Sequence, residues 1–245
     1  RGGLMPLILP GNVASATAPT TYDVANSCRW NRADEPYLAK TPTSTGSQTK
    51  YTLSVWFKIG NTESSARRDI IYAAYAGNLS RYSGIVINDA RVMEVFAGTY
   101  NGGTSTSLDY SYITTQTFQD PSAWYHLVLG VDTTDGVAAD RVKIWINNTR
   151  ITDFSTTDHA SSSGTSYYNY VDIPITIGAQ SFVSGDPSNW WDGYMAEVYW
   201  IDGTRYAPTD FGEYDEDSPT IWKPIDASGL NFGTNGFYLD FKDSA

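Results

Sequence analysis

Two carboxylates on one strand face can catalyse glycoside hydrolysis, and residues 213–217, which include Glu213 and Asp215, come closest to supplying such a pair. A retaining glycosidase needs its two carboxyl groups roughly 5 Å apart, a separation that residues i and i+2 of a strand provide. The stretch lies between Gly212 and Pro219, and this setting favours a solvated acidic turn over a strand. Glu197 is alone on its expected strand, without a carboxylate two residues away.

Few residues of this chain could support nucleophilic catalysis, because it has 2 histidines, 1 cysteine and no Gly-x-Ser-x-Gly motif. His126 lies in the apolar run 124–128, which favours a histidine packed within a sheet over a general base. The single cysteine, Cys28, allows neither an internal disulfide nor a multi-cysteine metal site. We therefore predict no catalytic residue, no enzymatic activity and no cofactor.

Asp132 and Asp135, followed by Asp140, offer carboxylate oxygens of the kind that calcium prefers. Their spacing lacks the EF-hand pattern and its terminal bidentate Glu. The alternative is a hairpin in which the Asp side chains cap their own backbone. We prefer this alternative and predict no metal site.

Aromatic side chains in polar loops are better candidates for recognition. Tyr and Trp faces stack on sugar rings, while nearby Asn and Asp accept hydrogen bonds from hydroxyl groups; the same aromatics are enriched in protein–protein contacts. Two Gly/Ser/Thr-rich stretches, 99–107 and 155–170, are predicted to be long loops. The candidate residues for contact with a glycan or a protein partner are Tyr100, Asn101, Tyr110, Tyr112, Tyr167, Tyr168, Tyr170, Trp190 and Trp191. Sugar binding, subunit contact and packing at the rim of the fold stay open as alternatives.

The elements that must carry these loops are β-strands, because apolar and polar side chains alternate with a period of two at 52–59, 142–147 and 237–242. Segment 124–131 is apolar on both faces and predicts a central strand. Further β-rich runs are 69–76, 84–88, 91–97, 124–132, 173–177 and 193–202. Asn-Gly and Asp-Gly dipeptides between the runs favour tight hairpins, and no amphipathic helix of ten residues is found. The pattern is typical of an all-β sandwich or barrel.

The composition supports one acidic, well-packed domain. The chain has 245 residues, 41% of them hydrophobic and 14% aromatic, which suffices for one large core. With 27 acidic against 16 basic residues the net charge is −11, so no nucleic-acid partner is expected. No apolar run approaches the roughly 18 residues of a membrane helix, so no membrane insertion is expected.

Several motifs, read in order along the chain, resemble a known family. They include residues 26–31, 37–38, 41–42, 51–58, 124–128, 132–134, 140–147, 192–198, 201–203 and 208–213. The C-terminal motifs are the most specific part, and the last of them reads Gly233-Thr234-Asn235-Gly236-Phe237-Tyr238-Leu239-Asp240-Phe241. The sequence resembles the concanavalin A-like, laminin-G-like jelly-roll proteins of tailed bacteriophages. One departure is Asn147-Asn148, where the family usually has Asn-Gly in a tighter hairpin.

The resemblance implies an all-β fold, a jelly-roll sandwich of two antiparallel sheets, for residues 22–245. Residues 1–21 are expected to form an extended N-terminal arm. The resemblance implies a non-enzymatic virion structural protein, a tail, fibre or capsid-surface component assembled in the host cytoplasm. Expected partners are other virion proteins and further copies of the chain, with a trimer suggested by architecture alone. A glycan-binding adhesin for host attachment is the main alternative and a glucanase-type hydrolase a remote one; no sugar-contacting motif can be matched residue by residue.

Overall fold

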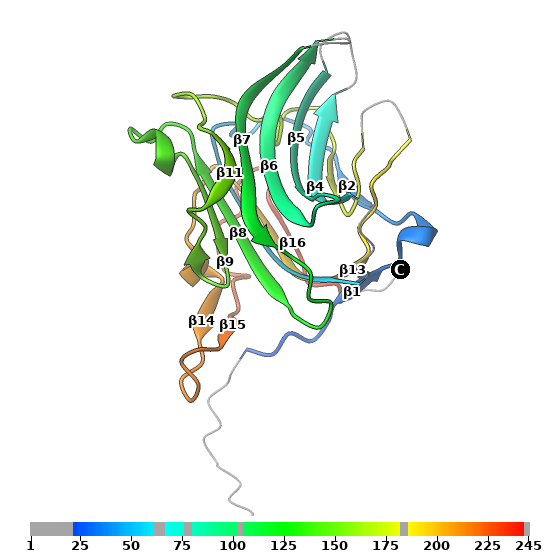
Figure 1. Ribbon diagram of the computed structural model, residues 1–245, viewed down its shortest axis with the longest axis vertical. Helices are drawn as coiled ribbons and strands as arrows, with labels where there is room; N and C mark the ends of the chain where they lie inside the picture. Colours follow the sequence, from blue (N-terminus) through cyan, green and yellow to red (C-terminus); the bar gives the residue numbers. More distant parts are fainter. Residues whose placement is uncertain (1–21, 61–66, 76–79, 102–104, 182–185, 243–245) are drawn as a thin grey trace, which may run out of the picture.

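Two antiparallel β-sheets pack face to face in the computed structural model, which describes residues 22–60, 67–75, 80–101, 105–181 and 186–242 (Figure 1). The first sheet has the order β1-β13-β3-β8-β9-β10, and β16 also pairs with β13. Its strands are β1 (Cys28–Trp30), β3 (Lys50–Ile59), β8 (Tyr125–Asp132), β9 (Val142–Ile146), β10 (Thr149–Arg150), β13 (Gly193–Asp202) and β16 (Phe237–Leu239). The predicted arm, residues 1–21, lies outside the described residues.

The second sheet has the order β11-β7-β6-β5-β4-β12-β2. Its strands are β2 (Leu38–Lys40), β4 (Arg68–Tyr75), β5 (Ser80–Ile87), β6 (Val92–Asn101), β7 (Ser105–Thr117), β11 (Phe154–Asp158) and β12 (Ile175–Ile177). A separate hairpin of β14 (Gly212–Tyr214) and β15 (Trp222–Pro224) stands beside the first sheet (Figure 1). The described residues also form three short 3-10 turns, η1 (Arg32–Asp34), η2 (Ala138–Asp140) and η3 (Pro208–Asp210). No helix in these ranges is both long and apolar enough to cross a membrane.

Strands that follow one another in the chain often belong to opposite sheets, as β2, β3 and β4 do. This alternation between the sheets, with all pairings antiparallel, defines a jelly-roll sandwich, and the predicted all-β fold class is confirmed. Sandwiches of this kind bury the inward-facing residues of both sheets in one shared core.

Strand alternation decides what each face of the first sheet presents. Leu53, Val55 and Phe57 of β3 are fully buried in the core between the sheets, so the neighbouring Ser54 and Trp56 point to the outer face. β8 pairs with β3 on one side and β9 on the other, which confirms the predicted central strand.

Part of that outer face is covered by the chain that follows β13. Val128 of β8 packs there against a second apolar cluster that includes Tyr199, Phe211 and Ala227. The covering segment explains why β8 is apolar on both of its faces. The remaining part of the outer face is not buried by this cluster.

The hairpin between β9 and β10 resolves the departure from the family pattern. Asn147 and Asn148 have φ angles of 49° and 64°, and Ile146 pairs with Thr149. Two consecutive residues in the left-handed region form a type I′ turn, which Asn tolerates better than most residues. The Asn147 side chain also accepts a 2.8 Å hydrogen bond from the backbone N–H of His126. The turn is therefore as tight as the Asn-Gly version.

Two of the strands that the sequence did not predict occupy stretches expected to be loops. β7 begins within the stretch 99–107, and β11 begins one residue before the stretch 155–170 and continues into it; both stretches were predicted to be loops. β11 is the edge strand of the second sheet, and its residues Ser155–Asp158 are exposed. A strand that buries little apolar surface needs no alternating pattern, so Ser- and Thr-rich strands escape detection.

Candidate functional site

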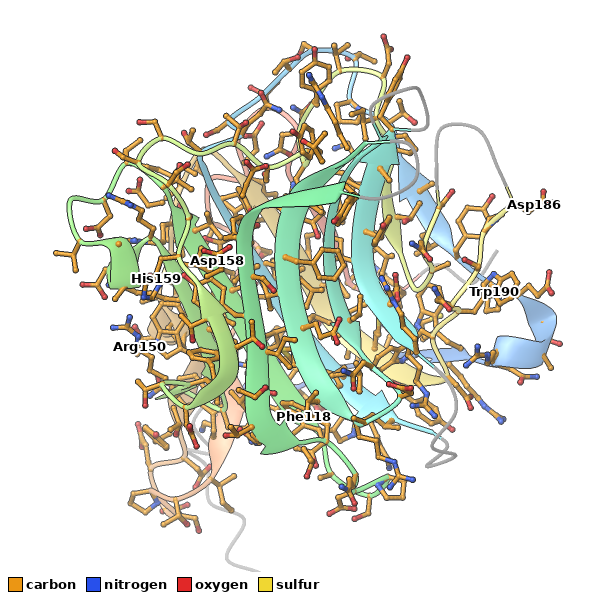
Figure 2. The ribbon with its side chains drawn as sticks, turned by 45° about the horizontal axis from the view of Figure 1, so that its top comes forward. Phe118, Arg150, Asp158, His159, Asp186 and Trp190 are labelled. Carbon is orange, nitrogen blue, oxygen red and sulfur yellow. The ribbon has the colours of Figure 1, made fainter. Side chains whose placement is uncertain are left out.

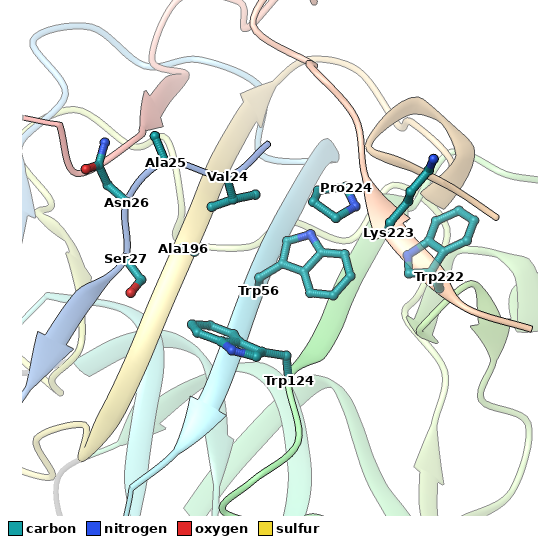
Figure 3. A pocket seen from close by; sticks show the side chains of 10 residues that line it. All are labelled: Val24, Ala25, Asn26, Ser27, Trp56, Trp124, Ala196, Trp222, Lys223 and Pro224. Carbon is teal, nitrogen blue, oxygen red and sulfur yellow. The ribbon is translucent and has the colours of Figure 1, made fainter. Parts of the chain in front are cut away.

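An open groove of about 350 Å³ lies on the uncovered part of the first sheet's outer face (Figure 3). One wall is the segment that leads into β1, and the opposite wall is β15 of the separate hairpin. Strands β3 and β13 form the floor through Trp56 and Ala196. The lining residues are Val24, Ala25, Asn26, Ser27, Trp56, Trp124, Ala196, Trp222, Lys223 and Pro224.

Three tryptophans from distant parts of the chain meet in this groove. Trp56 occupies an outward position on β3, and Trp124 directly precedes β8 beside it. Trp124 is 36% exposed, while Trp222 is nearly buried at 9%. The Nε1 atom of Trp56 is buried and has no hydrogen-bond partner among the described residues. The groove thus presents the exposed indole of Trp124 to the solvent, beside the half-buried Trp56.

His126 holds two of these tryptophans in place. It pairs with Trp56 across β3 and β8, and the two rings stack at a centroid distance of 4.7 Å and an interplanar angle of 8°. Its other neighbour is Trp222, whose ring lies 6.1 Å away at 20°. Trp222 Nε1 donates a 2.8 Å hydrogen bond to His126 Nδ1. The separate hairpin is therefore tied to the central strand.

This hydrogen bond determines the tautomer of His126. An indole N–H only donates, so Nδ1 of His126 accepts and the ring proton resides on Nε2. Nε2 then donates to Ser54 Oγ, 2.8 Å away. Complete burial lowers the pKa of His126 to about 3, which keeps the ring neutral.

The Ser54–His126 pair consequently lacks the arrangement of a catalytic dyad. A general base must present a lone pair to the serine hydroxyl, whereas this histidine presents a proton to Ser54. Both side chains are also fully buried. The prediction that His126 is a packed sheet histidine is confirmed.

Most of the aromatics that the sequence placed at recognition loops belong to the core. Tyr110, Tyr112, Tyr167, Tyr168 and Trp191 are between 0% and 7% exposed. Two of the tyrosines have hydroxyl partners inside: the hydroxyls of Tyr110 and Tyr51 lie 2.5 Å apart, and Tyr112 OH lies 3.0 Å from His159 Nδ1. Side chains without accessible surface cannot contact a glycan or a partner. For these five residues the burial therefore favours the packing alternative over contact with a glycan or a partner.

The remaining candidates divide into two groups. Tyr170 is half-buried against the core, and Trp190 is half-buried with an Nε1 that has no partner among the described residues. Figure 2 shows Trp190 near Asp186 on one flank of the molecule. Tyr100 and Asn101 lie in β6, but their side chains fall outside the described part.

The sequence pattern did not indicate the groove tryptophans as candidate contact residues, because they lie in or beside strands rather than in polar loops. One signal was present: Trp56 is a large apolar residue at a position of β3 that the alternation assigns to the outer face. Nothing in the local sequence around Trp124 or Trp222 indicates that they join it.

The acidic stretch 213–217 is part of the hairpin that forms one groove wall. Glu213 lies in β14, opposite Lys223 of β15, so the expected turn is in part a strand. Lys223 Nζ is 3.4 Å from Glu213 Oε1 and 3.4 Å from Asp215 Oδ2. Both carboxylates therefore form ion pairs with the same lysine.

Glu197 sits at a bulge in β13 and is bound by three phenol groups. Tyr199 donates a 2.7 Å hydrogen bond to it, and Tyr238 and Tyr22 each donate one of 2.9 Å. Burial, together with the carboxylate of Glu197, raises the pKa of Tyr199 and of Tyr22. These tyrosines stay protonated donors that tie the entering chain and β16 to β13.

The aspartates considered for calcium are engaged by protein groups. Asp132 accepts from the backbone N–H of Thr134 and forms a 2.9 Å ion pair with Lys50. Asp135 accepts from the N–H of Val137 and pairs with Arg205 at 3.0 Å. The described residues contain no group of three or more potential metal ligands. The capping interpretation of these side chains is confirmed.

Comparisons with known proteins concern the fold. No protein-family model matches the sequence, and no curated protein matches it. Among solved structures, domains LG4-5 of the mouse laminin alpha1 chain are similar with a TM-score of 0.48 and 10% identity, over 87% of this chain and 47% of that chain. The enzymatically active domain of tailspike protein 2 from bacteriophage CBA120 is similar with a TM-score of 0.47 and 15% identity, over 82% of this chain and 30% of that chain. A heptameric SAP-like pentraxin from Limulus polyphemus is similar with a TM-score of 0.46 and 11% identity, over 76% of this chain and 80% of that chain.

The chain spans less than half the length of the laminin and tailspike chains that it matches. Strand order and register define the class of this domain as a concanavalin A-like jelly-roll sandwich.

Proposed function

We propose that this chain is a non-enzymatic, carbohydrate-binding jelly-roll protein carried on a bacteriophage particle. The single observation behind carbohydrate binding is the open tryptophan groove on the first sheet. The phage assignment is supported by the sequence motifs alone, above all residues 192–198 and 233–241.

The groove has the properties that a sugar ring requires. The apolar C–H face of a pyranose packs on a flat aromatic ring, and its hydroxyl groups need polar atoms at the margin. Trp124 supplies an accessible face, and Asn26 and Ser27 lie along one wall. The volume of about 350 Å³ falls within the range of small-ligand sites.

Pre-organisation also favours a binding role. The Trp56, His126 and Trp222 rings form one stack, locked by the Trp222–His126 hydrogen bond. A ligand meets side chains that are already ordered, so little conformational entropy is lost on binding.

The acid and base groups near the groove support a non-enzymatic role. His126 carries its proton on the nitrogen that faces Ser54, and Glu213 and Asp215 are both engaged by Lys223. Glu197 is held by three phenols beneath the surface. None of these groups has the free, facing geometry of a hydrolase pair.

A glycan array probed with the full chain tests this function, together with the variants W124A and Y37A. Trp124 lines the groove, whereas Tyr37 is a comparably exposed aromatic (44%) outside it. We expect at least one glycan class to bind, with binding reduced at least tenfold in W124A and unchanged in Y37A. An empty array, or equal binding by W124A, would overturn the proposal.

Sedimentation of the same proteins separates sugar binding from a subunit contact. We expect W124A to keep the oligomeric state of the unaltered chain. If W124A instead lowers that state, the groove is an interface between copies. Immunogold labelling of the phage that encodes the chain tests the particle assignment, which unlabelled particles would contradict.

A further inference from the structure

We infer that the groove binds an acidic glycan, with the carboxylate of one sugar unit held between Arg29 and Lys58 beside Trp124. This inference rests on the proposed carbohydrate-binding function and adds the class of sugar. It comes from a row of side chains that crosses four segments of the first sheet.

Strand register places this row on the outer face. Arg29 of β1 is the partner of Tyr194 in β13, and Tyr194 is the partner of Lys58 in β3. Directly opposite residues of antiparallel strands share one face of a sheet. Lys58 has the same parity along β3 as Trp56, which lines the groove, so the whole row faces outward.

Ring contacts connect the row to the groove. Lys58 Nζ lies 5.9 Å from the centroid of the Tyr194 ring, and that ring lies 6.4 Å from the ring of Trp124. A sugar stacked on the exposed face of Trp124 therefore has Tyr194 and Lys58 at its margin. Arg29, on the other side of Tyr194, is exposed.

These two cations differ from six others in the described ranges. Lys50, Arg67, Lys143, Arg150, Arg205 and Lys223 each form an ion pair with a carboxylate. Arg29 and Lys58 have no carboxylate within ion-pair distance among the described residues. In a chain of net charge −11, two such neighbours form a local cationic site.

The carboxylate of Asp120 lies close enough to Lys58 to feel its charge. Hydrogen bonds from Ser122, with a smaller contribution from the charge of Lys58, lower the pKa of Asp120, which is therefore ionised. Neither Asp120 nor another described carboxylate forms an ion pair with Arg29 or Lys58, so both cations are available to an anion. At the opposite end, Glu213 and Asp215 outnumber Lys223. An anionic group is thus favoured at the Trp124 end only.

The net charge of the chain does not cancel this preference. At physiological ionic strength exposed charges are screened beyond roughly 8 Å, so cations in direct contact dominate over distant carboxylates. A carboxylate that accepts from Lys or Arg forms a charge-assisted hydrogen bond, which is stronger than a neutral one.

Binding of one sugar polymer in two chemical forms tests the inference. Oligogalacturonate carries a carboxylate on every unit, and its carboxyl-reduced form has the same linkages without charge. We expect the full chain to bind the acidic form at least tenfold more tightly, and sodium chloride to weaken only that interaction. Sialyllactose against lactose provides a second acidic and neutral pair.

Single-residue variants test which side chains cause the preference for the acidic glycan. K58Q and R29Q should each weaken binding of the acidic form roughly tenfold and leave the neutral form within twofold, because each removes one charge-assisted contact. R81Q is the matched control: Arg81 lies 5.4 Å from the Tyr167 ring, another cation over a tyrosine, but on the second sheet. R81Q should change neither affinity.

The possible failures are distinguishable. If neutral glycans bind in the groove as tightly as acidic ones and W124A abolishes both, carbohydrate binding stands and the acidic preference is refuted. The same holds if K58Q and R29Q leave the preference intact. If neither form binds and the array is empty, the proposed function itself is overturned.

Discussion

The indole Nε1 of Trp222 donates a 2.8 Å hydrogen bond to Nδ1 of His126, which lies 96 residues earlier in the chain. This contact joins the β14–β15 hairpin to the central strand of the first sheet and aligns two of the groove tryptophans. A surface groove thus depends on a buried, neutral histidine.

Replacing Trp222 by Phe should lower the free energy of unfolding by about 1–3 kcal/mol. The Phe ring keeps part of the stacking, but Nδ1 of His126 loses its donor while it remains buried. Urea denaturation measures the change. W190F serves as the control, because Trp190 Nε1 has no hydrogen-bond partner among the described residues. Equal losses for W222F and W190F would show that the hydrogen bond contributes nothing.

Acidification should destabilise the protein through His126. Its pKa is about 3 in the folded state because of burial, against about 6.5 in an unfolded chain. A base with a depressed pKa contributes stability that is complete above pH 6.5 and is lost as the pH falls toward 3. The loss is up to about 1.4 kcal/mol per pH unit across that window. Urea titrations at pH 7, 6 and 5 should show this slope, and H126Q should lack it; an unchanged slope in H126Q would contradict the assignment.

Asp69 should contribute a pH dependence of stability with the opposite sign to that of His126. Burial raises its pKa to about 6, even though Arg67 bonds both of its oxygens and opposes the shift. An acid with a raised pKa contributes stability that is complete below its unfolded value of about 3.9 and is lost as the pH rises through 6. The difference in unfolding free energy between the unaltered chain and D69N should therefore shift by up to about 3 kcal/mol between pH 7 and pH 4, in favour of the unaltered chain at the lower pH. No shift across this range would refute the raised pKa.

Glu197 should be important for stability rather than for activity. It has a φ of 50° in β13, a conformation that costs a non-glycine residue about 1 kcal/mol or more. Three phenol donors offset this strain. E197Q turns part of this acceptor into a donor that faces phenols, so we expect a loss of about 2–3 kcal/mol in chemical denaturation. The exposed Glu213 is the control, and E213Q should stay within roughly 0.5 kcal/mol; similar losses in both would indicate that the phenol contacts are unimportant.

Much of the fold could be predicted from the sequence. The strands 142–146 and 193–202 match the expected runs, and β8 is central because its apolar residues occupy both faces. The strands β7 and β11 could not be found, since Ser- and Thr-rich strands near a sheet edge carry little alternation. The expected loop 99–107 put the neighbouring Tyr110 and Tyr112 among the candidate contact residues. Their shared parity in β7 instead directs both side chains into the core.

The sequence by itself determined the alternating strands, the all-β class and the packed histidine, because these follow from the period of side chains along a single segment. It also determined that Trp56 faces away from the core. Only the tertiary structure decided which outward aromatics stay accessible: Tyr199 is covered by the chain after β13, while Trp124 is not. The physical reason is that accessibility and charge pairing depend on which distant segments pack side by side. The same reason explains why Arg29 and Lys58, which are far apart in the sequence, flank Tyr194 on one sheet face, and why Tyr194 lies beside Trp124.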